Sequence, residues 1–211
     1  MIAAVVLDAF GTIVRIKRPT NPYRQLIREG RRQGVVLGSE SIGLVMTTNL
    51  PFEEMASFIG IELTLQQRGK MNQALERELA SIQAYSDAVE AVSRLRDAGL
   101  KLGICSNLAA PYGPVVRGLF PNLDGYAFSF ELGVVKPEPS IYRSICSQMD
   151  VEPGHVFGGE RGRVVMIGDS KRCDQDGPRL VGMMGLHLDR KRQGAINDLR
   201  QFVELVIDHI R

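Results

Sequence analysis

The chain has 211 residues, of which 44% are hydrophobic and 24% charged, a composition typical of a soluble globular protein. Its formal net charge of +2 is too small to indicate a nucleic-acid partner, and the N-terminal apolar run IAAVVL is too short to span a membrane and has no basic flank. Three cysteines without metal-ligand spacing indicate a reducing compartment, so we expect a cytoplasmic protein without a disulfide framework or membrane partner. These numbers leave the oligomeric state unknown.

The first predicted element is a buried strand over residues 2–7, because this run is short, rich in Val, and ends in a Gly-containing turn. Three later segments have a similar form and are also predicted to be strands, at residues 100–106, about 127–130, and 164–170. A Gly-rich stretch over residues 154–165 is predicted to be a surface loop or hairpin before the last of these strands.

Helical patterns lie between these strands. Ser86 and Asp87 can cap a helix with apolar positions at Val89, Val92 and Leu95, and Gly99 is suited to end it. Further helices are predicted over 23–33, 66–82, 140–149 and 199–210.

The alternation of strands and helices predicts an α/β fold with a doubly wound parallel sheet. Residues 14–83 break this alternation, because they contain helical patterns and no apolar strand of the kind found elsewhere. We therefore expect an α/β core formed by residues 1–13 and 84–211, with an inserted, mainly helical cap over 14–83.

Polar side chains end three of the predicted strands. In an open parallel sheet, ligands bind outside the carboxyl ends of the strands, where Asp8, Ser106 and Asp169 are expected to converge. Lys136, in the segment VVKPEP, adds an ammonium group. Carboxylates together with an ammonium group suit Mg²⁺ and a phosphate, because Mg²⁺ takes one or two carboxylates and keeps positions for substrate oxygens.

Four motifs in this order, LDAFGT, ICSN, KPEPSIY and MIGDSKRCDQDG, resemble the signature motifs of the haloacid dehalogenase superfamily of hydrolases. The resemblance covers the core, about two-thirds of the chain, and the insert falls where members of that superfamily carry a helical cap. The resemblance implies a Rossmann-like core and an enzyme that forms an aspartyl intermediate.

The resemblance also implies roles for individual residues. Asp8 would be the nucleophile, and Lys136 would neutralise negative charge on it and on the phosphoryl oxygens. Hydrogen bonds to the transferring group would come from Thr12, Ser106 and Asn107. The ligands of Mg²⁺ would be Asp8, Asp169 and the backbone carbonyl of Phe10. Asp174 would be an orienting carboxylate beside Lys136 or the metal. Asp176 is expected to be a solvent-facing loop acid.

Phe10 departs from the pattern of typical phosphatases in the superfamily, which have an aspartate there that protonates the leaving oxygen and then activates water. General acid-base catalysis contributes roughly 10² to 10⁴ in rate. Its absence is compatible with a slow phosphatase, with a substrate whose leaving group needs no acid, or with a different reaction.

The different reaction is 2-haloacid dehalogenation, because the dehalogenases that name the superfamily have an aromatic residue at the position of Phe10 and work without a metal. They also use a position matching Tyr142, but they carry a small neutral residue at the position of Asp169. A carboxylate there would repel Asp8 unless a cation lay between the two. Asp169 therefore favours a Mg²⁺-dependent phosphatase acting on a small phosphorylated metabolite. A non-catalytic binding or regulatory protein with this fold is the third hypothesis.

The start of the predicted cap is strongly basic, with seven arginines and lysines and one glutamate between Val14 and Val35. Such a segment would raise the local concentration of a small anionic substrate if it faced the site. A solvated helix face is the alternative interpretation of the same charges.

Overall fold

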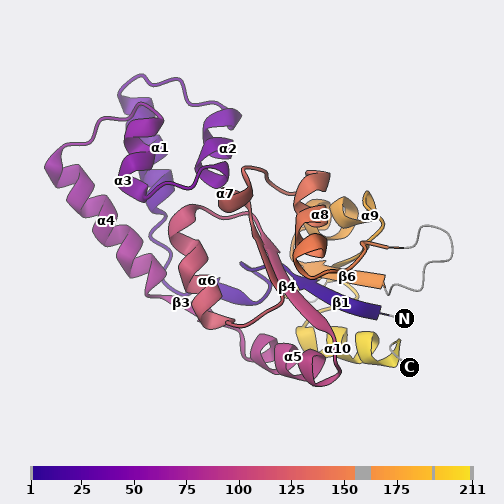
Figure 1. Cartoon of the computed structure of the whole chain (residues 1–211). Coiled ribbons are helices and arrows are strands. Elements are labelled where there is room, and N and C mark those ends of the chain that lie inside the picture. Colours follow the sequence, from indigo (N-terminus) through magenta and orange to yellow (C-terminus); the bar gives the residue numbers. More distant parts are fainter. Residues whose placement is uncertain (1, 155–162, 192, 210–211) are drawn as a thin grey trace.

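The computed structural model describes residues 2–154, 163–191 and 193–209. Its central sheet has the order β5-β4-β1-β6-β7, and every neighbouring pair is parallel (Figure 1). The strands are β1 (Ile2–Leu7), β4 (Lys101–Ser106), β5 (Gly125–Phe128), β6 (Arg163–Gly168) and β7 (Met184–His187). The predicted parallel α/β sheet is confirmed.

Helices cover both faces of the sheet, which is why β1 is apolar at nearly every position. Val5 and Leu7 belong to a core that includes residues of α5 (Ser86–Asp97) and α10 (Leu199–Asp208). Ala4 and Val6 point to the other core, formed with α8 (Pro139–Gln148). The first core continues into the inserted segment, through residues such as Leu26. The β-strand period of two thus divides one strand between two hydrophobic cores.

Several predicted elements differ in the structure. The strand expected over 127–130 ends at Phe128, and Ser129–Leu132 forms the short helix α7. Helix α5 does begin at Ser86, but its N-cap residue is Tyr85, with no side-chain cap. Val89 was expected to face the core and is 55% exposed. Most of the Gly-rich segment 154–165 lies outside the described residues, because residues 155–162 are not among them.

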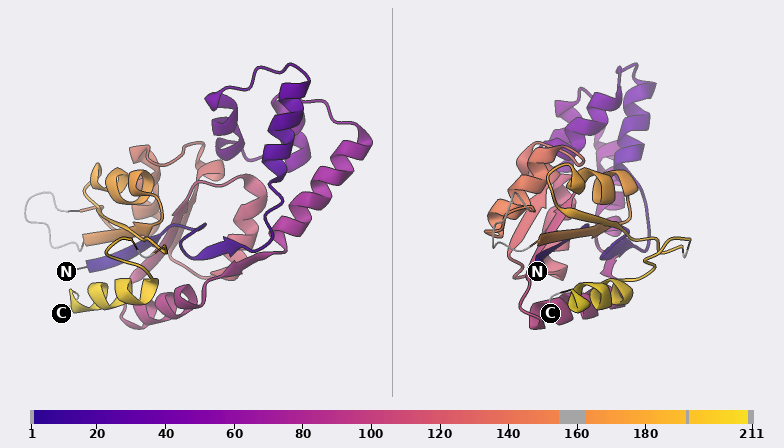
Figure 2. Two further views of the ribbon diagram at one scale, coloured as in Figure 1. Left: turned by 180° about the vertical axis from the view of Figure 1, so that it is seen from behind. Right: turned by 90° about the vertical axis from the view of Figure 1, so that its right-hand side faces the viewer.

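The insert contains four helices among its described residues: α1 (Pro22–Arg32), α2 (Ser39–Thr47), α3 (Phe52–Phe58) and α4 (Leu65–Leu79). It also contains an antiparallel pair of short strands that the sequence did not predict, β2 (Val14–Ile16) and β3 (Ile82–Ala84), where the chain leaves and re-enters the core. The four helices stand beyond the carboxyl ends of β1 and β4 (Figures 1 and 2). We call residues 14–83 the cap.

Glu78 of α4 ties the entry of the cap to the core. One of its carboxylate oxygens accepts hydrogen bonds from the backbone N–H groups of Thr20 (2.5 Å) and Asn21 (2.6 Å). The other accepts the hydroxyl of Tyr112 at 2.7 Å, from the short 3₁₀ helix η1 (Ala110–Tyr112) of the core. Since Glu78 is only 4% exposed, these bonds satisfy a buried carboxylate and fix the cap against the core.

None of the helices in the described residues is both long enough and apolar enough to cross a membrane.

Candidate active site

Three adjacent strands bring the predicted polar residues to one edge of the sheet. Asp8 follows β1, Ser106 ends β4, and Asp169 follows β6, while β1 lies between β4 and β6. The chain continues from Asp169 into a π-helical turn, η2 (Lys171–Asp176), which carries Asp174. The site therefore depends on the strand order, which makes residues far apart in sequence into neighbours.

Asp8 is 6% exposed, and its carboxylate is held by three side chains. Its Oδ1 accepts hydrogen bonds from Lys136 Nζ at 2.7 Å and from Ser106 Oγ at 3.0 Å. Its Oδ2 accepts a hydrogen bond from Thr12 Oγ1 at 3.1 Å. Donors on both oxygens fix the orientation of the carboxylate before any substrate arrives.

Lys136 bridges Asp8 to a second buried carboxylate. Its Nζ lies 2.7 Å from Oδ1 of Asp174 and 2.9 Å from the carbonyl oxygen of Cys105, so its three protons have three acceptors. The other oxygen of Asp174 accepts the backbone N–H of Ser170 at 2.9 Å. Asp174 thus orients Lys136, whereas Asp176 is exposed and lies 4.0 Å from Arg179.

Two glycines make room for the carboxylates. A Cβ on Gly11 would overlap Oδ2 of Asp169, and a Cβ on Gly168 would overlap the carboxyl group of Asp174. Gly11 also has a φ of +81°, which side chains other than glycine rarely adopt. The Gly-Thr turn after Asp8 is therefore required by close approach as well as by backbone conformation.

One carboxylate oxygen from each of Asp8, Asp169 and Asp174 lies within 4.8 Å of the other two. Burial and the charge of Asp8 raise the pKa of Asp169 and that of Asp174 above their ordinary values. Burial alone would lower the pKa of Lys136, but the neighbouring carboxylates Asp8 and Asp174 raise it. Only one ammonium group, which pairs with Asp8 and Asp174, lies among these three carboxylates, and a hard divalent cation with oxygen ligands fits the surplus of negative charge.

Asn107 holds the loop that carries Lys136. Its side-chain amide donates to the carbonyl oxygen of Lys136 at 3.0 Å, and its Oδ1 accepts the backbone N–H of Lys136 at 2.7 Å. The amide NH₂ group has two protons, so this contact leaves one for the role that the resemblance implies.

Arg190 binds the backbone of the loop that follows the candidate nucleophile Asp8, a contact that the sequence did not predict. Its guanidinium donates to the carbonyl oxygens of Gly11 at 3.2 Å and Thr12 at 2.6 Å. It also pairs with Asp87 at 3.0 Å and stacks on Tyr85 with its Cζ 3.9 Å from the ring centroid. No local pattern links Arg190 to a loop about 180 residues earlier.

A cavity of about 680 Å³ opens between the cap and the core beside this cluster. Phe10 lies in its wall and makes an edge-to-face contact with Tyr112, with a centroid distance of 5.7 Å. The rest of the lining is mostly apolar and includes Arg24, Arg28 and Arg31 of α1. These three arginines belong to the basic segment noted in the sequence, whereas the tyrosines Tyr23 and Tyr112 in the wall had no sequence signal.

Fold and site together define a hydrolase-like α/β enzyme with a strand-end carboxylate as its candidate nucleophile. Residues 2–181 match the model of the haloacid dehalogenase-like hydrolase family, and the chain belongs to that family. It is 26% identical over 214 residues to phosphatase MT3486 of Mycobacterium tuberculosis, covering 94% of each protein. It is also 27% identical over 127 residues to glyceraldehyde 3-phosphate phosphatase of Methanopyrus kandleri, covering 59% of this chain and 50% of that protein.

Solved structures with the same fold include different activities. A phosphatase from Thermococcus onnurineus has a TM-score of 0.65 at 21% identity, covering 97% of this chain and 98% of that one. A 2-haloacid dehalogenase from Pseudomonas syringae has a TM-score of 0.66 at 15% identity, covering 99% and 100%. An enzyme from Bacteroides thetaiotaomicron in complex with magnesium and inorganic phosphate has a TM-score of 0.62 at 14% identity, covering 90% of this chain and 95% of that one. At these identities the likeness establishes the fold, and the chemistry depends on the residues of this site.

Proposed function

We propose that this protein is a Mg²⁺-dependent phosphatase that acts on a small phosphorylated metabolite through an aspartyl-phosphate at Asp8. The observation that carries the proposal is the cluster of Asp8, Asp169 and Asp174, in which a single lysine, Lys136, pairs with Asp8 and Asp174. Carboxylates at a site for an anionic substrate repel one another and the substrate, so this arrangement requires a bound cation. The phosphatases among the related proteins agree with this proposal.

Mg²⁺ would be held by Asp8, Asp169 and the backbone carbonyl of Phe10, and when bound it would supply positive charge against the phosphoryl oxygens. Asp8 would attack phosphorus in line with the leaving oxygen. Lys136 would stabilise the charge shared by Asp8 and the phosphoryl group, with Asp174 holding the ammonium in position. Thr12 and Ser106, which donate to Asp8 in the structure, would turn their hydroxyls toward phosphoryl oxygens once phosphate enters.

The test is release of inorganic phosphate from a panel of phosphate monoesters, with Mg²⁺ and with EDTA. We expect release by the unaltered chain only with Mg²⁺ and no release by Asp8→Asn. Asp176→Asn is the matched control, because it makes the same chemical change at an exposed aspartate nearby. Phosphate release that persists in Asp8→Asn or in EDTA would refute the proposal.

A second candidate is 2-haloacid dehalogenation, favoured by Phe10 at the position where an acid is expected. The same Asp8 would then attack carbon, and halide would leave without a proton. Asp169 beside Asp8 argues against it, since two close carboxylates without a cation repel each other. Halide release from a short haloacid in EDTA would decide for this reaction, and Mg²⁺ binding without turnover of either substrate class would indicate a binding protein.

A further inference from the structure

Phe10 stands where typical phosphatases of the superfamily have a proton-donating aspartate, and its ring forms part of the apolar wall of the cavity. The cavity that it lines contains no carboxylate and no imidazole among the residues that the structure describes. The two hydroxyls in the wall belong to Tyr23 and Tyr112. Burial raises the pKa of both, so each phenol is a weaker proton donor than an ordinary tyrosine. The Tyr112 hydroxyl is moreover already bound to Glu78.

The wall is aromatic on the side next to the nucleophile loop. Phe10 contacts Tyr112 edge to face, Tyr112 lies 6.3 Å from the ring of Tyr23, and Tyr23 lies 5.0 Å from Phe52. Leu108 and Ala109 continue this surface directly after the Ser106 strand end. Aromatic walls favour flat, apolar groups, because ring pairs gain from edge-to-face and offset contacts in addition to burial. Tyr23 Oη, which is buried, has no hydrogen-bond partner among the described residues.

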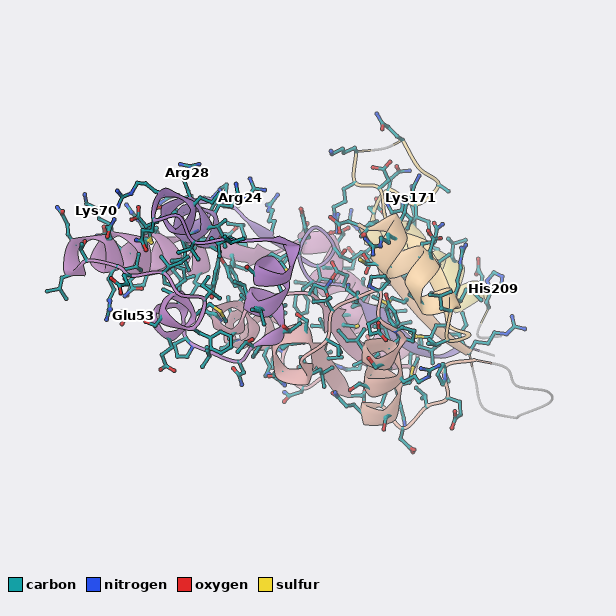
Figure 3. All side chains as sticks on the ribbon, turned by 90° about the horizontal axis from the view of Figure 1, so that it is seen from above. Arg24, Arg28, Glu53, Lys70, Lys171 and His209 are labelled. Atoms are coloured by element: carbon teal, nitrogen blue, oxygen red, sulfur yellow. The ribbon has the colours of Figure 1, made fainter. Side chains whose placement is uncertain are left out.

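The part of the cavity lining that α1 contributes is cationic. Arg24, Arg28 and Arg31 stand at i, i+4 and i+7 of α1, so they form one stripe of the helix, and all three line the cavity. Arg24 and Arg28 are labelled beside α1 in Figure 3. In the described part of the chain, none of the three makes a side-chain hydrogen bond or ion pair, unlike Arg32, which pairs with Glu29. Their charges are available to a ligand.

We infer that the cavity takes the leaving group of an aryl phosphate that carries a second anionic group, such as a carboxylate, at the end remote from phosphorus. This inference rests on the proposed phosphatase function and specifies its substrate class. The ring would lie against Phe10 and Tyr112, and the remote anion would meet the arginine stripe.

The chemistry of such a substrate agrees with the loss of the acid. An oxygen of Asp8 bonds to phosphorus while the bond from phosphorus to the aryl oxygen breaks, and the electron pair leaves as a phenolate that needs no proton. Water then attacks the phosphorus of the aspartyl-phosphate, the bond to Asp8 breaks, and the proton of the water passes to solvent. An alkyl phosphate would have to expel a much more basic alkoxide, for which the missing acid would matter.

The first experiment compares phenyl phosphate with benzyl phosphate, which keeps the ring but leaves as an alkoxide. We expect a kcat/KM about 100-fold higher for phenyl phosphate, the range that general acid catalysis usually supplies. Equal values for the two esters would overturn the inference and leave the proposed function intact. Absence of Asp8-dependent phosphate release from every ester would refute the function itself, and the inference with it.

The second experiment compares 4-carboxyphenyl phosphate with phenyl phosphate in Arg28→Gln. We expect kcat/KM to fall about 10-fold more for the carboxylated ester than for phenyl phosphate, the effect of losing a charged hydrogen bond to the carboxylate. Lys70→Gln is the control, because it removes the same charge from α4 of the cap at a residue that lies apart from Arg24 and Arg28 in Figure 3. Equal losses for both esters, or no loss for either, would overturn the assignment of the arginine stripe.

Discussion

Lys136 Nζ lies 2.7 Å from Oδ1 of Asp8, although the two residues are 128 positions apart in the chain. The same ammonium group lies 2.7 Å from Asp174, and all three side chains are almost fully buried. The lysine is therefore both a structural counter-charge and, in the proposed mechanism, the group that stabilises the transferring phosphoryl.

Replacing this lysine is expected to destabilise the fold as well as remove activity. Lys136→Met leaves two buried carboxylates without their counter-charge, which costs about 3–5 kcal/mol of the free energy of unfolding. Adding Asp174→Asn is expected to recover part of that loss, because one buried charge is removed. Urea unfolding measures both variants.

Lys101→Met is the control, because Lys101 is partly exposed and its nearest carboxylate is the exposed Asp150 at 3.9 Å. Its loss removes a hydrogen bond to the carbonyl oxygen of Met149 but leaves no buried charge unpaired. A loss for Lys136→Met no larger than for Lys101→Met would show that the buried ion pairs are not formed.

Gly11 is expected to control the metal site through Asp169. In Gly11→Ala the new methyl group displaces the Asp169 carboxylate, so the affinity for Mg²⁺ measured by calorimetry is expected to fall about 10-fold or more. Gly34→Ala is a matched control, since Gly34 has a similar φ of +79° but open space around it. An alanine at positive φ destabilises both variants by about 1–2 kcal/mol, but only Gly11→Ala should lose affinity for Mg²⁺. Equal affinities in the two variants would argue against Asp169 as a ligand.

Asp87 is expected to make the stability of the chain depend on acid pH. Burial opposes its charge, but the hydrogen bonds from Arg190 and from the backbone N–H of Leu199 outweigh it and lower the pKa of Asp87. A pKa below that of the unfolded chain, about 3.9, means that this stability is present above that pH and is lost as the pH falls through the folded-state value.

Asp87→Asn should therefore be less stable than the unaltered chain at neutral pH, and the difference should shrink as the pH falls below about 4. Thermal unfolding between neutral and acid pH provides the measurement, with Asp97→Asn on the exposed side of the same helix as the control. A difference between Asp87→Asn and the unaltered chain that stays constant with pH would contradict the assigned ion pair.

The sheet and the strand-end residues could be predicted because each of these strands is an apolar run that stops at a polar residue. Asp8, Ser106 and Asp169 are visible in this way, and the parallel order makes them neighbours. The choice of Asp174, which binds Lys136, over the exposed Asp176 depended on the resemblance to the fourth motif of the family. A local signal therefore carried the strand-end residues, and the family resemblance carried Asp174.

Other parts had no such signal. Strand β7 reads MGLH, a short segment that gives no apolar run, and β2 and β3 have three residues each, too few for a period to be recognised. Arg190 binds the nucleophile loop, and Phe10 packs on Tyr112 in the wall of the cavity. Both contacts join segments that only the folded chain brings together. Tertiary contacts of this kind leave no pattern in a single sequence.

The central claim is that Asp8 becomes phosphorylated, and Phe10 makes this intermediate easier to observe. The residue that normally activates water is absent from that position, so hydrolysis of the aspartyl-phosphate is expected to be slower than its formation. Reaction with 4-nitrophenyl phosphate should then begin with a burst of nitrophenolate, followed by slower steady turnover.

The most direct test is acid quenching of that reaction in Mg²⁺ during the burst, followed by peptide mass analysis. We predict one phosphoryl group on the peptide that contains Asp8, and none in Asp8→Asn. Steady turnover with an unmodified Asp8 peptide throughout the burst, or with the phosphoryl group on another residue, would contradict the account.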